Sequence, residues 1–105
     1  MDSLVPPAVL PIDGAAERLT TEQVGEGDVE RLLEDGLDRR EWLVVKRTST
    51  FVGEFAIIAH VDGEWWTTMA TAHPILGVDR SPPRRVEPAD VREWTASDRV
   101  YRCHL

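Results

Sequence analysis

The feature that most constrains this chain is the dipeptide Asp62-Gly63, which lies between two runs of strand-forming residues. The first run covers residues 54–61 and the second covers residues 64–72, and both are rich in β-branched and aromatic side chains. A tight two-residue turn needs positive φ at both positions, and Asp-Gly is among the dipeptides that best tolerate it. The sequence therefore predicts an antiparallel β-hairpin that turns at Asp62-Gly63.

A two-residue turn also fixes the register of the hairpin, because successive side chains of a strand point to opposite faces. We expect His60 to face Trp65, and Ala59 to face Trp66. The face that we predict to be the core face carries Phe55, Ile57, Ala59, Val61, Trp66, Ala70 and Ala72. The opposite face carries Glu54, Ile58, His60, Trp65, Thr67, Met69 and Thr71.

The remaining segments give shorter patterns. Apolar residues recur at helical spacing in residues 28–36, and a glycine at the end can stop this short amphipathic helix. Residues 42–48 and 100–105 are rich in strand formers and predict two further strands. Residues 73–85 are interpreted as a long connection. We expect single helical turns in residues 19–24 and 87–94, the second with Pro88 at its first position.

These elements predict an α+β fold that is dominated by β-structure. We expect a small antiparallel sheet or an SH3-like barrel built on the hairpin, with the helix at about 28–36 packed on it. The resemblance to SH3-like barrels covers residues 40–93 and rests on the order of the elements alone. Residues 1–15 are rich in proline and predict a flexible N-terminal segment, and residues 16–105 have the usual size of a single globular domain.

Charge restricts the class of partner. The chain has a net charge of -7, and residues 1–38 contain ten acidic but only two basic side chains. Phosphate groups would be repelled by this segment, so we expect neither nucleic acid nor a membrane as a partner. A basic protein partner remains compatible with the charge, as does a plain solvated surface.

Composition also indicates where the chain works. The single Cys103 excludes an internal disulfide, and we find neither a signal-like opening nor an apolar run long enough to span a bilayer. We therefore expect a cytoplasmic protein. All but one of the twelve Lys and Arg residues are Arg, and Asn is absent, a bias that we associate with a high-GC bacterial genome.

Familiar chemical motifs are missing. His60 and Asp62 have a spacing that suits metal ligands, but no third ligand follows, and Asp62 is explained by the turn. Cys103 and His104 are neighbours, so on a strand they point to opposite faces and cannot form a dyad. The sequence contains no phosphate loop or dinucleotide fingerprint. We therefore predict no metal and no cofactor.

Trp65 gives the chain its candidate binding surface. A helix or strand covers its face, or else that face binds something through Trp65, Ile58, Thr67, Met69 and Thr71. Our first hypothesis is a protein-interaction module of accessory, regulatory or immunity type. The alternative is a small enzyme of specialised metabolism in which His60 and Glu54 act in an open pocket beside Trp65. A small-molecule ligand and a homodimer both remain possible partners.

Overall fold

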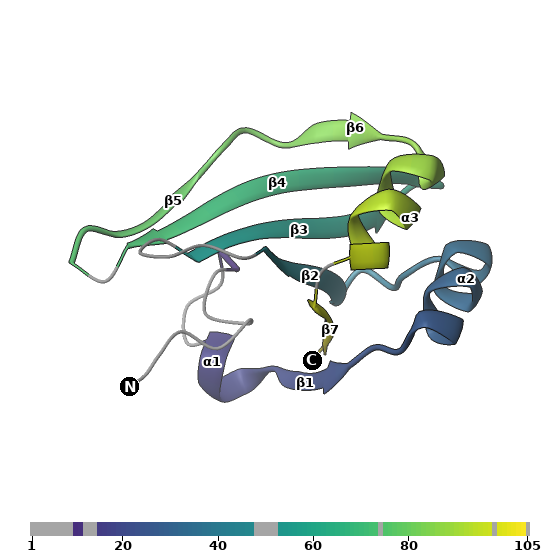
Figure 1. The fold of residues 1–105 in the computed structure, drawn as a ribbon, viewed down its shortest axis with the longest axis horizontal. Coiled ribbons are helices and arrows are strands. Elements are labelled where there is room, and N and C mark those ends of the chain that lie inside the picture. Colours follow the sequence, from purple (N-terminus) through teal and green to yellow (C-terminus); the bar gives the residue numbers. More distant parts are fainter. Residues whose placement is uncertain (1–9, 12–14, 48–52, 74, 98, 105) are drawn as a thin grey trace.

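The computed structural model describes residues 10–11, 15–47, 53–73, 75–97 and 99–104 of the 105-residue chain. These residues form a sheet of seven antiparallel strands with three helices (Figure 1). The strands are β1 (Thr20–Gln23), β2 (Glu41–Arg47), β3 (Gly53–Val61), β4 (Glu64–His73), β5 (Gly77–Arg80), β6 (Arg84–Val86) and β7 (Arg99–His104). The helices are α1 (Ala15–Arg18), α2 (Glu26–Asp35) and α3 (Pro88–Ser97).

The strands lie in the order β1-β7-β2-β3-β4-β5, and β6 pairs with another part of β4. β2, β3 and β4 are neighbours in sequence and in space, whereas β7 returns from the end of the chain to lie between β1 and β2. β1 at one edge does not pair with β5 or β6 at the other. The sheet is therefore open, and of the two predicted architectures the antiparallel sheet is observed, not the closed barrel.

The central hairpin has the predicted turn and register. Asp62 and Gly63 both have positive φ, 53° and 80°. Val61 pairs with Glu64, His60 with Trp65, and Ala59 with Trp66. This part of the prediction is confirmed because a two-residue turn determines the pairing locally.

Helices α2 and α3 pack together on one face of the sheet and enclose the larger part of the core, at the end of the molecule away from the β4–β5 turn (Figure 1). Trp65 of β4 belongs to this core and is 5% exposed. Its buried neighbours in the cluster are Leu37, Leu43, Val45, Ala56, Ile58, Val86, Val91 and Val100. Leu32, Leu33 and Trp94 of the two helices pack against them.

The opposite face of the sheet is covered over only part of its length. Leu10 and Leu19 pack there on a second cluster, whose sheet residues are Val44, Phe55, Ile57, Ala70, Ala72 and Cys103. Nearer the hairpin turn the cover ends: Ala59 and Trp66 are half-buried, and Val61 is 46% exposed. The face that was predicted to be the core face is therefore buried only at the end away from the hairpin turn.

Two segments differ from the prediction at the N-terminal side. Residues 20–23 form strand β1 instead of a helical turn, because they pair with β7, from Thr20 opposite His104 to Gln23 opposite Tyr101. This long-range pairing outweighs the local capping pattern. Helix α2 begins at Glu26, two residues before the prediction, so that Asp28 lies in its first turn and accepts a hydrogen bond from the Gly25 amide.

Two further differences lie after the hairpin. The stretch predicted as a connection contains β5 and β6, which pair with opposite ends of β4 and are separated by Ser81-Pro82-Pro83. Helix α3 begins at Pro88 as expected but continues for ten residues. It extends because Val91 and Trp94, three residues apart, both pack on the sheet.

Most of the predicted flexible segment 1–15 lies outside the described residues. Leu10, which is described, is buried in the second cluster. Among the residues that the structure describes, no helix has both the length and the apolar content needed to cross a bilayer.

Candidate functional site

The binding surface predicted around Trp65 is largely covered. Ile58 and Thr67 are fully buried beside it, and the Thr67 hydroxyl donates a hydrogen bond of 3.0 Å to the Ile57 carbonyl oxygen. Met69 packs against the same core, while Thr71 remains exposed toward the far end of β4. The role of these residues in binding stays a prediction. The sheet face that carries them is mainly covered by helices α2 and α3.

His60 lies at the margin of this covered face. Its ring is half-buried and contacts Trp65 in a tilted arrangement, with 4.5 Å between the ring centroids and 41° between the ring planes. Glu54 is on the same strand, six residues away, which corresponds to about 20 Å at a strand rise of about 3.4 Å per residue. The structure therefore does not bring His60 and Glu54 together, and the open pocket that the enzyme hypothesis needs beside Trp65 is occupied by helices.

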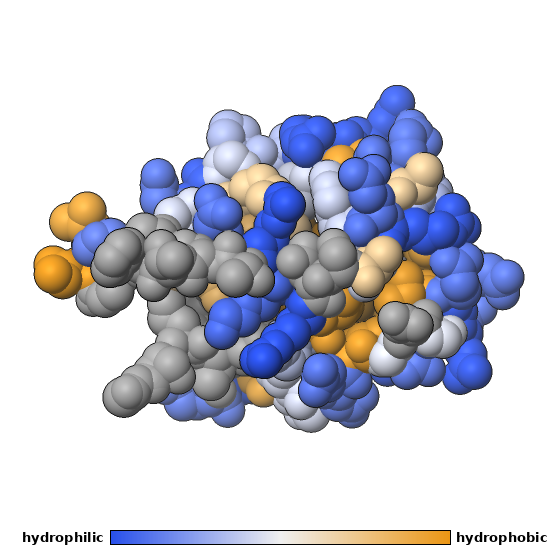
Figure 2. Space-filling model, in the orientation of Figure 1, coloured by the Kyte–Doolittle hydropathy of each residue, from blue (hydrophilic) through white to orange (hydrophobic). Residues whose placement is uncertain are grey.

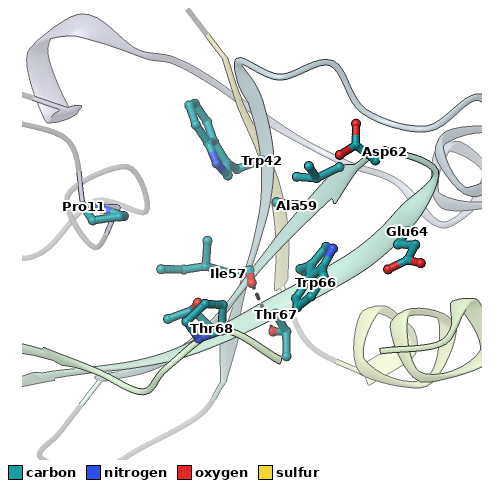
Figure 3. Close-up of a pocket in the computed structure, with 11 residues that line it drawn as sticks. Pro11, Trp42, Ile57, Ala59, Asp62, Glu64, Trp66, Thr67 and Thr68 are labelled. Carbon is teal, nitrogen blue, oxygen red and sulfur yellow. Dashed lines mark hydrogen bonds between the residues drawn. The ribbon is translucent and has the colours of Figure 1, made fainter. Parts of the chain in front are cut away.

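An open pocket exists on the other face of the hairpin, and we call it the tryptophan pocket (Figure 3). Its volume is about 550 Å³. The described residues that line it are Pro11, Trp42, Ile57, Ala59, Val61, Asp62, Glu64, Trp66, Thr67, Thr68 and Pro83. Most of them are apolar, and they come from β2, β3, β4, the hairpin turn and two proline-containing segments. The pocket lies where the cover of this face ends.

The register of three adjacent strands explains why two tryptophans meet here. Trp66 pairs with Ala59 across β3 and β4. Leu43 pairs with Ile58 at the end of the β2–β3 ladder, so Trp42 lies one residue further, beside Ala59. The two indoles therefore flank a residue with only a methyl side chain (Figure 3). A small residue between two large ones leaves a hollow in the surface of the sheet.

The rim of the pocket is acidic on the side of the hairpin turn. Asp62 and Glu64 line it, and both are exposed. Glu64 forms an ion pair of 3.3 Å with Arg85 of β6. For Asp62, no hydrogen bond or ion pair is found among the described residues. The rim thus carries one compensated carboxylate and one carboxylate that is available to a ligand.

Another hollow, which is polar, lies where β2 begins and β7 ends. Its lining residues are Asp38, Arg39, Arg40, Glu41, Arg102 and His104. Glu41 is nearly buried and holds Arg102 in an ion pair. Burial raises the pKa of Glu41, but the Asp38 amide and the charges of Arg102 and His104 outweigh it and hold the pKa below the usual value of a glutamate. This arrangement is a structural ion pair.

Cys103 is fully buried in the second core cluster, and its thiol lies 3.8 Å from the Thr21 hydroxyl. Burial raises the pKa of the thiol, which opposes formation of a reactive thiolate. His104, the next residue, is 3.6 Å from Glu22 and lines the polar hollow instead. The two neighbours face opposite sides of β7, as alternation predicts.

Three arginines, one at the end of β5 and two in β6, are engaged within the molecule. Arg80 donates a hydrogen bond to the Leu10 carbonyl oxygen, and Arg84 lies over the Trp94 ring at 5.8 Å. Arg85 is the partner of Glu64 described above. Among the described residues, no group of three potential metal ligands occurs.

One apolar feature lies outside both the tryptophan pocket and the polar hollow. Ile75 and Leu76, at the turn between β4 and β5, are 86% and 83% exposed. Figure 2 shows hydrophobic side chains at this end of the molecule. The amides of both residues donate hydrogen bonds of 3.1 Å to Nδ1 of His73, which fixes the turn.

Sequence reasoning assigned Trp66 to the core and did not place Trp42 in a site. Alternation separates Trp65 from Trp66 correctly, but it does not say which face the helices cover. The available signal was the predicted pairing of Ala59 with Trp66, which puts a small residue beside a large one.

Comparison of the chain with protein-family models, curated proteins and solved structures found no match.

Proposed function

We propose that this chain is a non-catalytic interaction module that binds a protein partner through the tryptophan pocket. The observation that carries this proposal is a pocket of about 550 Å³ in which two half-buried tryptophans flank Ala59 on an uncovered sheet face. Tryptophan is among the residues most enriched at the energetic centres of protein interfaces. Val61 extends the apolar surface toward the turn.

The side chains of the pocket favour binding over catalysis. Of its described lining residues, only Asp62 and Glu64 ionise, and both are exposed at the rim. The Thr67 hydroxyl is already bonded to the Ile57 carbonyl. General acid–base and nucleophilic catalysis depend on a group held beside its proton donor or acceptor, and the described lining residues offer apolar contact instead.

The charge of the chain supports a basic partner. The net charge is -7, and the acids of the rim lie where a partner would approach the pocket. Complementary charge speeds encounter and selects among partners more than it adds affinity. An accessory, regulatory or immunity-type role and a cytoplasmic location, which the single Cys103 supports, belong to the same proposal.

Affinity capture from the source cell tests the proposal with matched variants of β4. We expect the native chain and Thr71→Ala to retain the same protein, whereas Trp66→Ala loses it. Thr71 is exposed on the strand face opposite Trp66, so it controls for a partner that binds the other side. Ala59→Leu fills the hollow without removing a tryptophan and is expected to lose the partner too.

Retention of the same proteins by all four chains would overturn the proposal. Loss on Thr71→Ala but not on Trp66→Ala would place the interface on the face that carries Trp65. Circular dichroism of each variant before capture shows whether a loss reflects unfolding, and Ala59→Leu provides the answer if Trp66→Ala does not fold.

A further inference from the structure

We infer that the tryptophan pocket receives an aromatic side chain of the partner that stands next to a lysine or arginine. This inference rests on the proposed function and adds the chemistry of what is bound. It follows from the spacing of the two indoles, from the way β4 is already paired, and from the acids of the rim.

The spacing of the strands sets the width of the hollow. Trp42 and Trp66 are on the strands at either side of β3, and neighbouring strands are about 4.8 Å apart, so their Cα atoms are separated by about 10 Å. A planar ring stacked between two others needs about 7 Å between the outer planes, at carbon contacts of about 3.5 Å. The space above Ala59 therefore suits a flat ring between two indoles, with a methyl group as its floor.

The pairing of β4 excludes a different mode of peptide binding at this place. A peptide strand could add to the sheet only at an edge with free backbone groups. Beside the pocket, Trp66 is already paired with Arg85 of β6 on one side and with Ala59 on the other. A partner can therefore enter the hollow only with a side chain, which again favours a protruding ring.

The rim supplies the preference for a cation next to that ring. The Glu64 carboxylate is compensated by Arg85, whereas the neighbouring Asp62 carboxylate has no ion-pair partner in the described part of the chain. Both lie on the side of the hairpin turn. A lysine or arginine beside the inserted ring would reach Asp62, and the indole faces also attract cations. A carboxylate in that position would be repelled.

Three small probes test ring shape and charge separately by NMR titration of the intact chain. The probes are tryptamine (a ring with an ammonium group), indole-3-acetate (the same ring with a carboxylate) and 3-methylbutylamine (an ammonium group without a ring). We expect tryptamine to bind weakly, at about millimolar concentration for so few atoms, and to shift the indole N–H signals of Trp42 and Trp66. Indole-3-acetate should bind at least about five-fold more weakly, because the sign of its charge is reversed. The aliphatic amine should not saturate.

Matched variants locate the effect. Asp62→Asn keeps a residue that tolerates positive φ in the turn, and we expect it to weaken tryptamine binding by about two- to five-fold, the range for an exposed ion pair. Asp79→Asn removes an exposed acid of β5 whose side chain does not line the pocket, and should change nothing. Ala59→Leu should abolish the shifts. Spectra of the free variants show that each is folded.

The outcomes separate this inference from the function that it rests on. Equal binding of the two indole probes, or shifts confined to Trp65 or Trp94, would overturn the inference even if Trp66-dependent capture of a protein succeeds. Tryptamine binding with the expected preferences, without any captured protein, would support the preference of the pocket for a ring beside a cation and would overturn the proposed function, a protein partner. A chain that dimerises at titration concentrations and becomes monomeric on Ala59→Leu would show that a second copy occupies the pocket, which also overturns the inference.

Discussion

Gly36 ends helix α2 with a φ of +79°, a conformation that side chains rarely adopt. Its amide donates a hydrogen bond of 2.8 Å to the Leu32 carbonyl oxygen. A Cβ atom at this position would lie 2.6 Å from Nδ1 of His60, which is closer than real contacts allow. The position therefore requires glycine both for its backbone angle and for the space that His60 occupies.

We predict that Gly36→Ala lowers the free energy of unfolding by about 1–3 kcal/mol, since both strain and displacement of His60 act against the folded state. The matched control is Gly27→Ala, inside helix α2, where an added Cβ meets nothing within 4 Å. That change should raise stability by up to about 1 kcal/mol through helix propensity. Urea unfolding of the three chains measures both effects, and equal effects at the two glycines would contradict the described geometry.

Glu41 connects stability to pH. Its pKa is lowered in the folded chain by the Asp38 amide and by Arg102 and His104, despite the opposing effect of burial. A lowered pKa means that the unfolded chain takes up the proton first as the pH falls. The stabilising contribution is therefore complete above the unfolded value of about 4.3 and is lost as the pH falls through the lower folded value.

We predict that Glu41→Gln costs about 1–2 kcal/mol at pH 7, because Arg102 then loses its carboxylate partner. This is near the lower end of the values for a hydrogen bond to a charged group, because the Arg102 side chain is 37% exposed. The difference from the native chain should shrink as the pH falls from about 4.3 through the lower pKa of the folded chain, below which Glu41 is neutral in both states. Urea unfolding at pH 7 and at successively lower pH measures this difference. If the difference in the free energy of unfolding between the two chains stayed constant over that pH range, the stability contributed by Glu41 would not depend on its charge.

At the scale of the element, strand β4 presents adjacent tryptophans to different environments. Trp65 is enclosed by the two helices, whereas Trp66 is half-buried at the open pocket. We predict that Trp65→Ala lowers the free energy of unfolding by about 3–5 kcal/mol, the usual cost of truncating a buried tryptophan. Trp66→Ala should cost clearly less, because part of its ring is already in water. Chemical unfolding of both variants decides the point, and the reverse order would mean that the covered and open faces are exchanged.

The strands and helices also show which parts of the fold can be predicted from the sequence. The turn at Asp62-Gly63 and the register of β3 and β4 were predictable, because they depend on neighbouring residues. The strand at residues 20–23 was missed because its partner β7 is about 80 residues away. Helix α3 was underestimated because Val91 and Trp94 gain their contacts from the sheet and not from the helix itself.

At the scale of the whole molecule, the two faces of one sheet differ because both longer helices lie on the same side (Figure 1). Only a long-range arrangement determines this: β7 must enter between β1 and β2, and α3 must precede it. For this reason the binding surface predicted from the sequence, around Trp65, lies one residue away in β4 from the pocket residue Trp66. The alternation of side chains along β4 places Trp65 and Trp66 on opposite faces. The position of the two helices determines that Trp66 is the more accessible of the two tryptophans.

The most direct test of this account is the solvent accessibility of the tryptophan side chains, measured with and without the captured partner. A soluble paramagnetic gadolinium chelate broadens NMR signals of indole N–H groups that solvent reaches. We predict strong broadening for Trp42 and Trp66 and little for Trp65 in the free chain, with protection of Trp42 and Trp66 when the partner binds. Broadening of Trp65 above that of Trp66, or a complex in which Trp42 and Trp66 stay fully accessible, would contradict the account.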